Sequence, residues 1–363
     1  MTRLTIPEIG EEEIEAVAAV LRSGYLVQGQ QVQEFERLVG EYVGVRHAVA
    51  VSSGTAALHL ALLALGIGPG DEVIVPDFTF PATANVVTLT GATPVLVDID
   101  LATFNIAVDR IRQAITSKTK AILPVHLFGQ PADMEPICRI AQQHGLFVVE
   151  DAACALGAEY RGRKCGGIGH VGCFSFHPRK VITTGEGGMV VTDDESIAEC
   201  VRQLRNHGMV KRDEGTWFER AGLNYRMTEF QGAFGVVQMK RLDGIIARRA
   251  ELAGLYDRLL SPLDFIIRPR EAAGVRHSWQ SYVVLLQEGI DRDRVMRGLR
   301  EHGIETTLGT YSVSAQPCYA GGEWNVPNSR RAYEQSLCLP LYPRMSAADV
   351  EMIAVCLGQI LMK

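Results

Sequence analysis

Hydrophobic and polar residues alternate along this chain with two different periods. Near the N-terminus, apolar residues recur every three or four positions over residues 14–21 and 32–39, and each run ends at a Ser-Gly or Gly step. This spacing predicts two helices with a break between them. Short β-branched runs then alternate with helical stretches, which predicts strands near residues 47–51, 72–75, 93–97, 121–125 and 147–149 and helices near residues 55–65, 82–90, 108–115 and 134–144.

This alternation indicates an α/β fold with a mostly parallel sheet and helices on both faces. In such sheets, ligands bind beyond the carboxyl ends of the strands. The residues that directly follow each predicted strand are therefore the first candidates for a functional site.

Composition and charge narrow the function classes. The chain has 363 residues, 47% hydrophobic and 21% charged, which suits a soluble globular protein with one large and one smaller domain. A formal net charge of -6 gives no electrostatic reason to expect nucleic acid or an anionic membrane as partner, so we expect a small-molecule substrate.

Two further features bear on cellular location and metal content. The N-terminal residues lack the apolar core of a signal peptide, and no later run is long enough to span a bilayer, so we expect a cytoplasmic protein. Eight cysteines are scattered without a CxxC pair. This pattern predicts buried, reduced thiols, with neither a disulfide framework nor a metal site.

The segment Ser52-Ser53-Gly54-Thr55 lies between a predicted strand and a predicted helix. Small residues at a helix N-terminus can bind a phosphate, which makes Gly54 and Thr55 candidates for phosphate binding. A plain helix N-cap explains the same residues equally well at this point.

Two other residues follow predicted strands. Phe80 could stack on a flat ligand, although an aromatic residue in this place is more often part of the core. Asp151 could pair with a buried cationic group, or could simply cap a turn. Residues 167–172 match GxGxxG, but they follow a polar run and precede a predicted strand, so we interpret them as a turn and not as a dinucleotide site.

Lys180 stands between an aromatic segment and a glycine-rich run in FSFHPRKVITTGEGG. Most lysines are solvated surface charges. Together, however, this lysine, a phosphate-binding turn, an aromatic ring and a strand-end Asp are the groups expected in a site for pyridoxal 5'-phosphate. In such a site the lysine would form the Schiff base. Asp151 would hold the pyridine nitrogen protonated, Ser175 would add a hydrogen bond to the phosphate, and Cys154 would line the ring edge.

The chain resembles the nucleotide-sugar aminotransferases of the DegT/DnrJ group, in the aspartate aminotransferase superfamily. The resemblance runs almost end to end, through SGYLVQG, SSGTAAL, VPDFTFPATAN, VHLFGQPADM, VEDAACALGA, FSFHPRK, RNHG, GLNYRMTEFQG and SLCLPLYPRMS. It implies the PLP-dependent fold type I, with a seven-stranded sheet flanked by helices and a smaller C-terminal α/β domain. We place the large domain at residues 1–245 and the small domain at residues 246–363.

The resemblance also implies roles for single residues. It places the Schiff base on Lys180 and the carboxylate that faces the pyridine nitrogen on Asp151. Phe80 becomes the stacking ring, and the phosphate contacts fall on Gly54, Thr55 and Ser175. Asn224, or alternatively Arg226, would reach the phosphate of a neighbouring subunit, which implies a homodimer with shared active sites.

The activity implied by the resemblance is transamination from glutamate to a keto sugar on a nucleotide diphosphate, with a C4 ketone favoured over C3. Lys180 would move the proton as general acid and base. Four basic residues could bind the diphosphate, although a solvated loop is the favoured interpretation of all four: Arg205, His207, Lys211 and Arg212.

Two departures and two alternatives accompany this expectation. The family often has Gln or His in the place of Cys154, and Ser314 stands in the place of a histidine in a loop expected to help hold the substrate. A fold type I enzyme acting on a non-sugar substrate is the first alternative. A non-catalytic regulator is the second, and the lack of room for a DNA-binding helix-turn-helix disfavours it. Lys180 argues against the related dehydratases, which carry histidine there.

Overall fold

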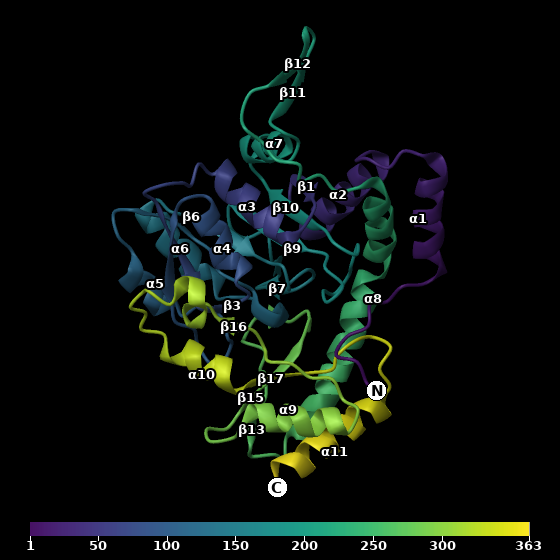
Figure 1. Ribbon diagram of the computed structural model, residues 1–363, viewed down its shortest axis with the longest axis vertical. Helices are drawn as coiled ribbons and strands as arrows, with labels where there is room; N and C mark the ends of the chain where they lie inside the picture. Colours follow the sequence, from purple (N-terminus) through teal and green to yellow (C-terminus); the bar gives the residue numbers. More distant parts are fainter. Residues whose placement is uncertain (363) are drawn as a thin grey trace.

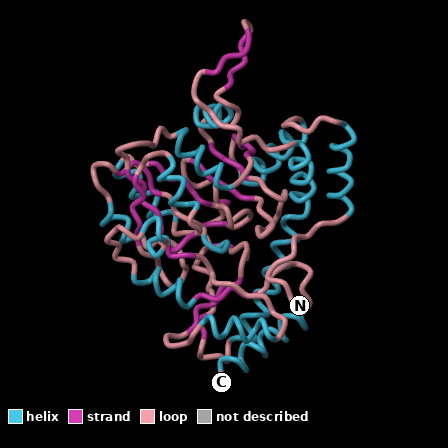
Figure 2. Tube along the Cα trace, viewed as in Figure 1, coloured by secondary structure: helices cyan, strands magenta, loops and turns pink. Residues whose placement is uncertain are grey.

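The computed structural model describes residues 1–362 and is organised around a seven-stranded sheet (Figures 1 and 2). The strand order is β1-β10-β9-β6-β5-β2-β4. Strand β10 is antiparallel to both neighbours, and the remaining pairs are parallel, which confirms the predicted fold class. The strands are β1 (His47–Val51), β2 (Glu72–Pro76), β4 (Thr93–Val97), β5 (Thr119–Ile122), β6 (Phe147–Asp151), β9 (Val171–Ser175) and β10 (Gly188–Thr192).

Helices cover both faces of this sheet because successive strand residues point to opposite sides. In β2, Val73 and Val75 pack with one group of helices, whereas Ile74 between them packs with the other. The first group is α3 (Gly54–Ala64), α4 (Ala82–Leu89) and α7 (Glu195–Leu204). The second is α2 (Gln30–Val43), α5 (Val108–Ala114), α6 (Met134–His144) and the first half of α8 (Glu229–Leu260), while α1 (Glu11–Ser23) packs against α8.

The predicted helices and strands are found close to their expected positions. The strand expected at residues 121–125 differs most, because it begins at Thr119 and ends at Ile122. Pro124 follows, and a proline has no N–H to continue the ladder of hydrogen bonds. The register of this segment is kept, since Leu123 N still donates to Ile74 O at 2.8 Å.

A second, smaller core lies below the large sheet in Figure 1. Its centre is a three-stranded antiparallel sheet in the order β13-β15-β17, packed against the second half of α8. The elements are β13 (Ile266–Ile267), β15 (Tyr282–Leu286), β17 (Ser336–Leu339), α9 (Arg292–Glu301) and α11 (Ala347–Leu361). Helix α10 (Pro327–Gln335) and β16 (Tyr311–Ser312) connect it to β3 (Phe78–Thr79) of the large unit.

Two details bear on the expected domain boundary. Helix α8 continues without interruption past residue 245. The N-terminal residues pack with the C-terminal unit, since Thr2 bridges to Ile304 and Leu341 N donates to Leu4 O at 3.2 Å. A division into residues 1–245 and 246–363 therefore stays a prediction, with α8 shared between the two units.

The first four residues of the GxGxxG match, 167–170, form a bend before β9, as predicted, and its last two residues begin that strand. The amides of this bend bind a carboxylate of this chain: Ile168 N and Gly169 N both donate to Glu150 Oε1 at 2.6 Å. Glu150 also contacts His126 Nε2 at 2.8 Å, and both side chains are fully buried. The turn thus stabilises a buried pair next to Asp151. The short strands β7 (Glu159–Tyr160), β8 (Arg163–Lys164) and β14 (Val275–Arg276) pair beside it.

The cysteines differ from expectation in their burial. Within residues 1–362 all eight are free thiols. Only Cys165, Cys173 and Cys338 are fully buried, and Cys318 is exposed. The prediction that all are buried is wrong because several lie on helix faces or loops where solvent reaches one side.

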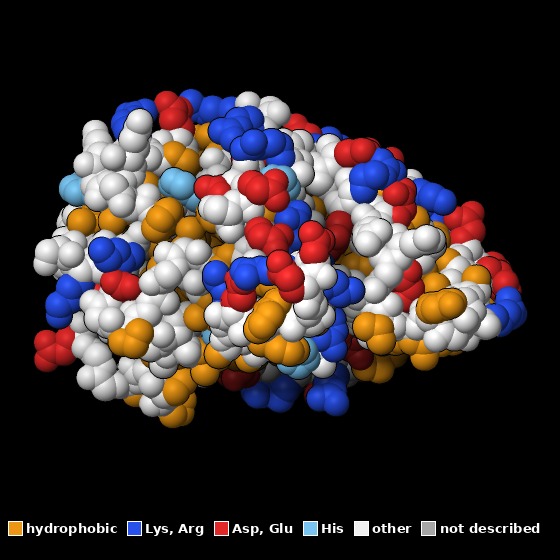
Figure 3. Space-filling view, turned by 90° about the horizontal axis from the view of Figure 1, so that it is seen from above, with side chains coloured by type: hydrophobic (Ala, Val, Ile, Leu, Met, Phe, Trp, Pro, Cys, Tyr) orange, Lys and Arg blue, Asp and Glu red, His pale blue; other side chains and the backbone are white. Residues whose placement is uncertain are grey.

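The hairpin of β11 (Met209–Arg212) and β12 (Gly215–Phe218) projects from the body of the molecule (Figure 1). The face seen in Figure 3 intersperses positive, negative and apolar side chains and shows no continuous basic surface. Among the helices of residues 1–362, none has both the length and the apolar character needed to cross a membrane.

Candidate active site

Strands β6 and β9 are parallel neighbours, so their carboxyl ends meet at one edge of the sheet. Beyond β9 the chain forms a turn, in which Lys180 N donates to His177 O at 2.8 Å. Beyond β6 a second turn carries Cys154. The Nζ atom of Lys180 lies 3.1 Å from Cys154 Sγ. The structure therefore brings together the two residues that the sequence placed on separate segments.

Asp151 is the last residue of β6, and its side chain is almost completely buried. Its Oδ2 accepts a hydrogen bond from Thr83 Oγ1 at 2.8 Å, and its Oδ1 accepts one from Ala153 N at 3.2 Å. The second bond shows that Asp151 does cap the turn. Burial raises the pKa of Asp151, because desolvation outweighs both hydrogen bonds and the positive charge of Lys180. A cationic ligand group would hold this carboxyl ionised.

The residues after β1 form the N-terminus of α3. Ser53 is its N-cap and accepts from Ala56 N at 3.1 Å. The amides of Gly54 and Thr55 have no hydrogen-bond partner within the described residues. The N-cap interpretation is therefore confirmed, and it is compatible with an anion site, because the cap leaves two donors at the positive end of the helix.

Gly54 also shapes the site. A Cβ atom at Gly54 would lie 2.7 Å from Cβ of Ser175, so only glycine allows this approach. The contact places Ser175, at the end of β9, against the N-terminus of α3. The three residues predicted to bind one phosphate are thus adjacent.

Phe80 lies between β3 and α4 and is 63% exposed. The alternative that Phe80 belongs to the core is therefore wrong. Its ring centroid lies 6.3 Å from that of Tyr311, edge to face. Thr83, the partner of Asp151, follows three residues later on α4. An exposed ring thus stands close in sequence to the residue that holds the buried carboxylate.

The GLNYR segment runs beside the chain's own β1, since Ser52 N donates to Tyr225 O at 2.8 Å. Arg226 is engaged within the chain, with Nη1 2.5 Å from Asn206 Oδ1. Asn224 is exposed, and its side chain makes no hydrogen bond within residues 1–362. Of the two residues considered for a neighbouring phosphate, Asn224 is the one left free to bind.

The four basic candidates separate in the structure. Arg205 is buried and pairs with Glu36 Oε1 at 2.6 Å, so the interpretation of a solvated loop is wrong for this residue. His207, Lys211 and Arg212 are exposed, the last two on the projecting hairpin. Arg205 and Arg212 thus have partners within the chain, Glu36 and Glu219, but only Arg205 is closed off from solvent.

The loop that carries Ser314 contacts Asp77, which directly follows β2. Asp77 is fully buried and accepts from Ser314 N and Ser312 Oγ, both at 2.6 Å. Burial raises the pKa of Asp77, while these two donors lower it. The sequence analysis did not identify Asp77 or Thr83. Both lie just beyond a strand, in VPDFTFPAT, and this position was the signal that could have identified them.

Taken together, these residues fit pyridoxal 5'-phosphate. An amine faces the end of β6, a buried carboxyl group lacks a cationic partner, two free amides point from a helix N-terminus, and Gly54 keeps this space clear of side-chain atoms. Such a set could hold a phosphate, a protonated ring nitrogen and a carbonyl carbon at once.

Comparison with known proteins agrees with a site for pyridoxal 5'-phosphate. The model of the "DegT/DnrJ/EryC1/StrS aminotransferase family" matches residues 7–358. The spore coat polysaccharide biosynthesis protein SpsC of Bacillus subtilis is 44% identical, over 96% of this chain and 94% of the relative. GDP-perosamine synthase of Caulobacter vibrioides is 44% identical, over 92% of this chain and 91% of the relative.

A solved structure shows the same fold with the cofactor. The putative sugar aminotransferase Spr1654 of Streptococcus pneumoniae, in its PLP form, superposes with a TM-score of 0.94 at 30% identity, over 99% of this chain and 98% of that chain. The predicted resemblance, fold and cofactor are confirmed. The chain belongs to the DegT/DnrJ/EryC1/StrS aminotransferase family and is a PLP-dependent aminotransferase.

Proposed function

We propose that this chain transfers an amino group from glutamate to a keto sugar carried on a nucleoside diphosphate, with a C4 ketone favoured over C3. The observation that carries the proposal is the contact of Lys180 Nζ with Cys154 Sγ beside the buried Asp151, which forms the centre of an aminotransferase site. The sugar nucleotide is supported by a relative that is named for a GDP-linked sugar.

Each residue has a distinct part in this proposal. Gly54 N, Thr55 N and Ser175 Oγ bind the cofactor phosphate, and Asp151 holds the ring nitrogen protonated. When bound, the cofactor supplies an electron-withdrawing ring that accepts the electron pair released at the substrate carbon. Lys180 Nζ would move the proton between the substrate carbon and C4' of the cofactor, toward C4' in the first half of the reaction and toward the substrate carbon in the second. Phe80 covers one face of the ring.

A substrate panel tests this function. Nucleotide-linked 4-keto and 3-keto sugars are presented to the aminated enzyme, and the return of its visible absorbance is followed for each sugar. A 4-keto sugar nucleotide is expected to restore the spectrum fastest, with glutamate as the donor that aminates the enzyme. Reaction with small keto acids and with none of the sugars would instead support the alternative of a non-sugar substrate.

We further propose that the active unit is a homodimer in which Asn224 reaches the phosphate held by the partner subunit. Asn224 is suited to this because it is exposed and has no partner within its own described chain. Exposed apolar side chains at Trp217 and Phe218 on the projecting hairpin also favour a contact with a second subunit.

Mixing two inactive variants tests the shared site. Asn224→Ala is expected to be inactive because it binds the cofactor too weakly, and Lys180→Ala because it lacks the reactive amine. Mixed dimers then hold one intact site, so refolding the two together should restore about a quarter of the wild-type activity, because half of the random dimers are mixed. The control is a mixture of Lys180→Ala with the double variant that carries both Asn224→Ala and Lys180→Ala, and this mixture should stay inactive. No recovery in the first mixture would place Asn224 in its own subunit's site.

A further inference from the structure

A three-residue segment of the small unit, Ser278–Gln280, contacts the main chain at two residues next to the lysine. Ser278 Oγ donates to Cys154 O at 3.2 Å. Gln280 Nε2 donates to Arg179 O at 2.9 Å. Arg179 directly precedes Lys180, and Cys154 carries the sulfur that lies against Lys180 Nζ. One short segment therefore contacts both the residue before Lys180 and the residue whose sulfur lies against Lys180 Nζ.

This segment is itself held firmly. Trp279 has a φ of 51°, a left-handed conformation that is unfavourable for a bulky residue and persists only where its surroundings impose it. Its ring stacks on that of His277, with centroids 4.1 Å apart and planes 8° apart. Trp279 N also donates to His277 Nδ1 at 2.8 Å. On the other side, Ser278 N donates to Gly129 O at 3.0 Å.

A buried cation fixes the carbonyl groups of the segment. Arg249 of α8 is 2% exposed, and its Nη1 lies 3.1 Å from both Trp279 O and Gln280 O and 3.0 Å from Leu341 O. No carboxylate within residues 1–362 pairs with Arg249, and its Nε has no hydrogen-bond partner. Burial lowers the pKa of Arg249 to about 10. A cation buried in this way is costly, and here it orients the main chain that carries Gln280.

We propose that Gln280 is a positioning residue for Lys180 and that Arg249 holds Gln280 in place. The proposal rests on the function proposed for Lys180. The bond from Gln280 fixes the carbonyl of Arg179, the turn closed by Lys180 N and His177 O keeps its shape, and Nζ stays against Cys154. Displacement of a reacting group by a fraction of an ångström lowers the reaction rate. The hydrogen bond from Gln280 to Arg179, one residue before Lys180, is therefore expected to affect the rate.

Gln280→Met tests this, because methionine has a similar length and volume but cannot donate a hydrogen bond. We expect kcat to fall about tenfold with the KM for glutamate unchanged, since only the placement of the amine changes. A second measurement uses the cofactor-free protein. A small amine-reactive reagent modifies Lys180, and peptide mass spectrometry follows the rate of this modification across pH. The midpoint of the resulting rate–pH curve should differ between the variant and the wild type.

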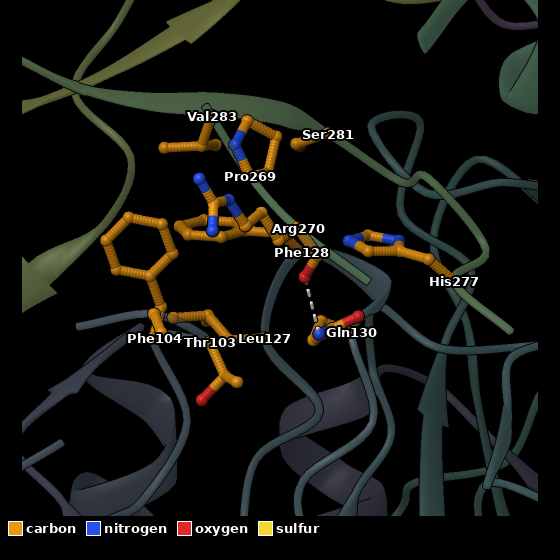
Figure 4. A pocket seen from close by; sticks show the side chains of 11 residues that line it. Thr103, Phe104, Leu127, Phe128, Gln130, Pro269, Arg270, His277, Ser281 and Val283 are labelled. Atoms are coloured by element: carbon orange, nitrogen blue, oxygen red, sulfur yellow. Dashed lines mark hydrogen bonds between the residues drawn. The ribbon is translucent and has the colours of Figure 1, made fainter. Parts of the chain in front are cut away.

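Gln130→Met is the matched control. Gln130 is also buried and also spans the two units, with Nε2 donating to Arg270 O at 3.0 Å (Figure 4). This variant loses the same kind of bond, but its partner carbonyl is not next to the lysine. We expect it to lose a similar amount of thermal stability while keeping kcat and the modification profile of Lys180.

Equal changes in the two variants, or no change in either, would overturn the proposal. If Gln280→Met is too unstable to purify, Gln280→Asn and Gln130→Asn provide the same comparison with a shortened amide. Lys180→Ala distinguishes a failure of the proposed function from a failure of the positioning role. If it keeps full activity, the function proposed for the lysine fails, whereas an inactive Lys180→Ala beside an unchanged Gln280→Met refutes only the positioning role.

Discussion

Lys180→Ala is expected to lower both half-reactions by roughly four orders of magnitude or more, because one side chain supplies both the attachment point and the proton transfer. The fold should be retained, since the side chain of Lys180 makes only the contact with Cys154 Sγ among the described residues. Single-turnover absorbance measurements with glutamate, and separately with the keto sugar, would determine the loss in each half.

Lys164→Ala is the control for this experiment. Lys164 pairs with Glu159 Oε1 at 2.7 Å on the short strand β8, away from the turn that carries Lys180. Its loss should leave both half-reactions unchanged. Substantial turnover by Lys180→Ala would count against every role assigned from this lysine outward. After treatment of the wild-type protein with borohydride, peptide mass spectrometry should find the cofactor attached to Lys180.

Asp151→Asn is expected to lower kcat/KM by about 10²- to 10³-fold while leaving the cofactor-free protein as stable as the wild type or more stable. The amide removes the negative charge that would hold the ring nitrogen protonated. Its oxygen can accept from Ala153 N and its NH2 group can donate to Thr83 Oγ1, so both contacts of Asp151 keep a partner and the site keeps its shape. Steady-state kinetics measures the first effect, and the thermal melting temperature of the cofactor-free protein measures the second.

The stability effect has a definite dependence on pH. Burial raises the pKa of Asp151 above its ordinary value of 3.8 in the folded protein. An ionised carboxyl group with a raised pKa costs stability above that folded pKa, and the cost disappears as the pH falls through it toward the unfolded value. The stability advantage of Asp151→Asn should therefore be largest near neutral pH and vanish in acid. An advantage that grows in acid would mean that Asp151 is not held as the structure shows.

Much of the fold could be predicted from local patterns. The near-continuous apolar runs of β2 and β6 are typical of parallel strands buried on both faces, and the helices between them follow from their period. The strand expected at 121–125 was misplaced because apolar residues continue past the point where Pro124 stops the ladder. Arg205 was misjudged because its partner, Glu36, lies on a distant helix.

The sequence by itself determined the order of helices and strands, the family, and the residue types of the site, because hydrophobic period and motif spacing are local properties of a chain. Only the tertiary structure decided which residues support them. Thr83 meets Asp151 across 68 positions, and Gln280 meets Arg179 across 101. Such contacts depend on how turns and loops from different strands pack at one edge of a sheet, and no local pattern records that arrangement.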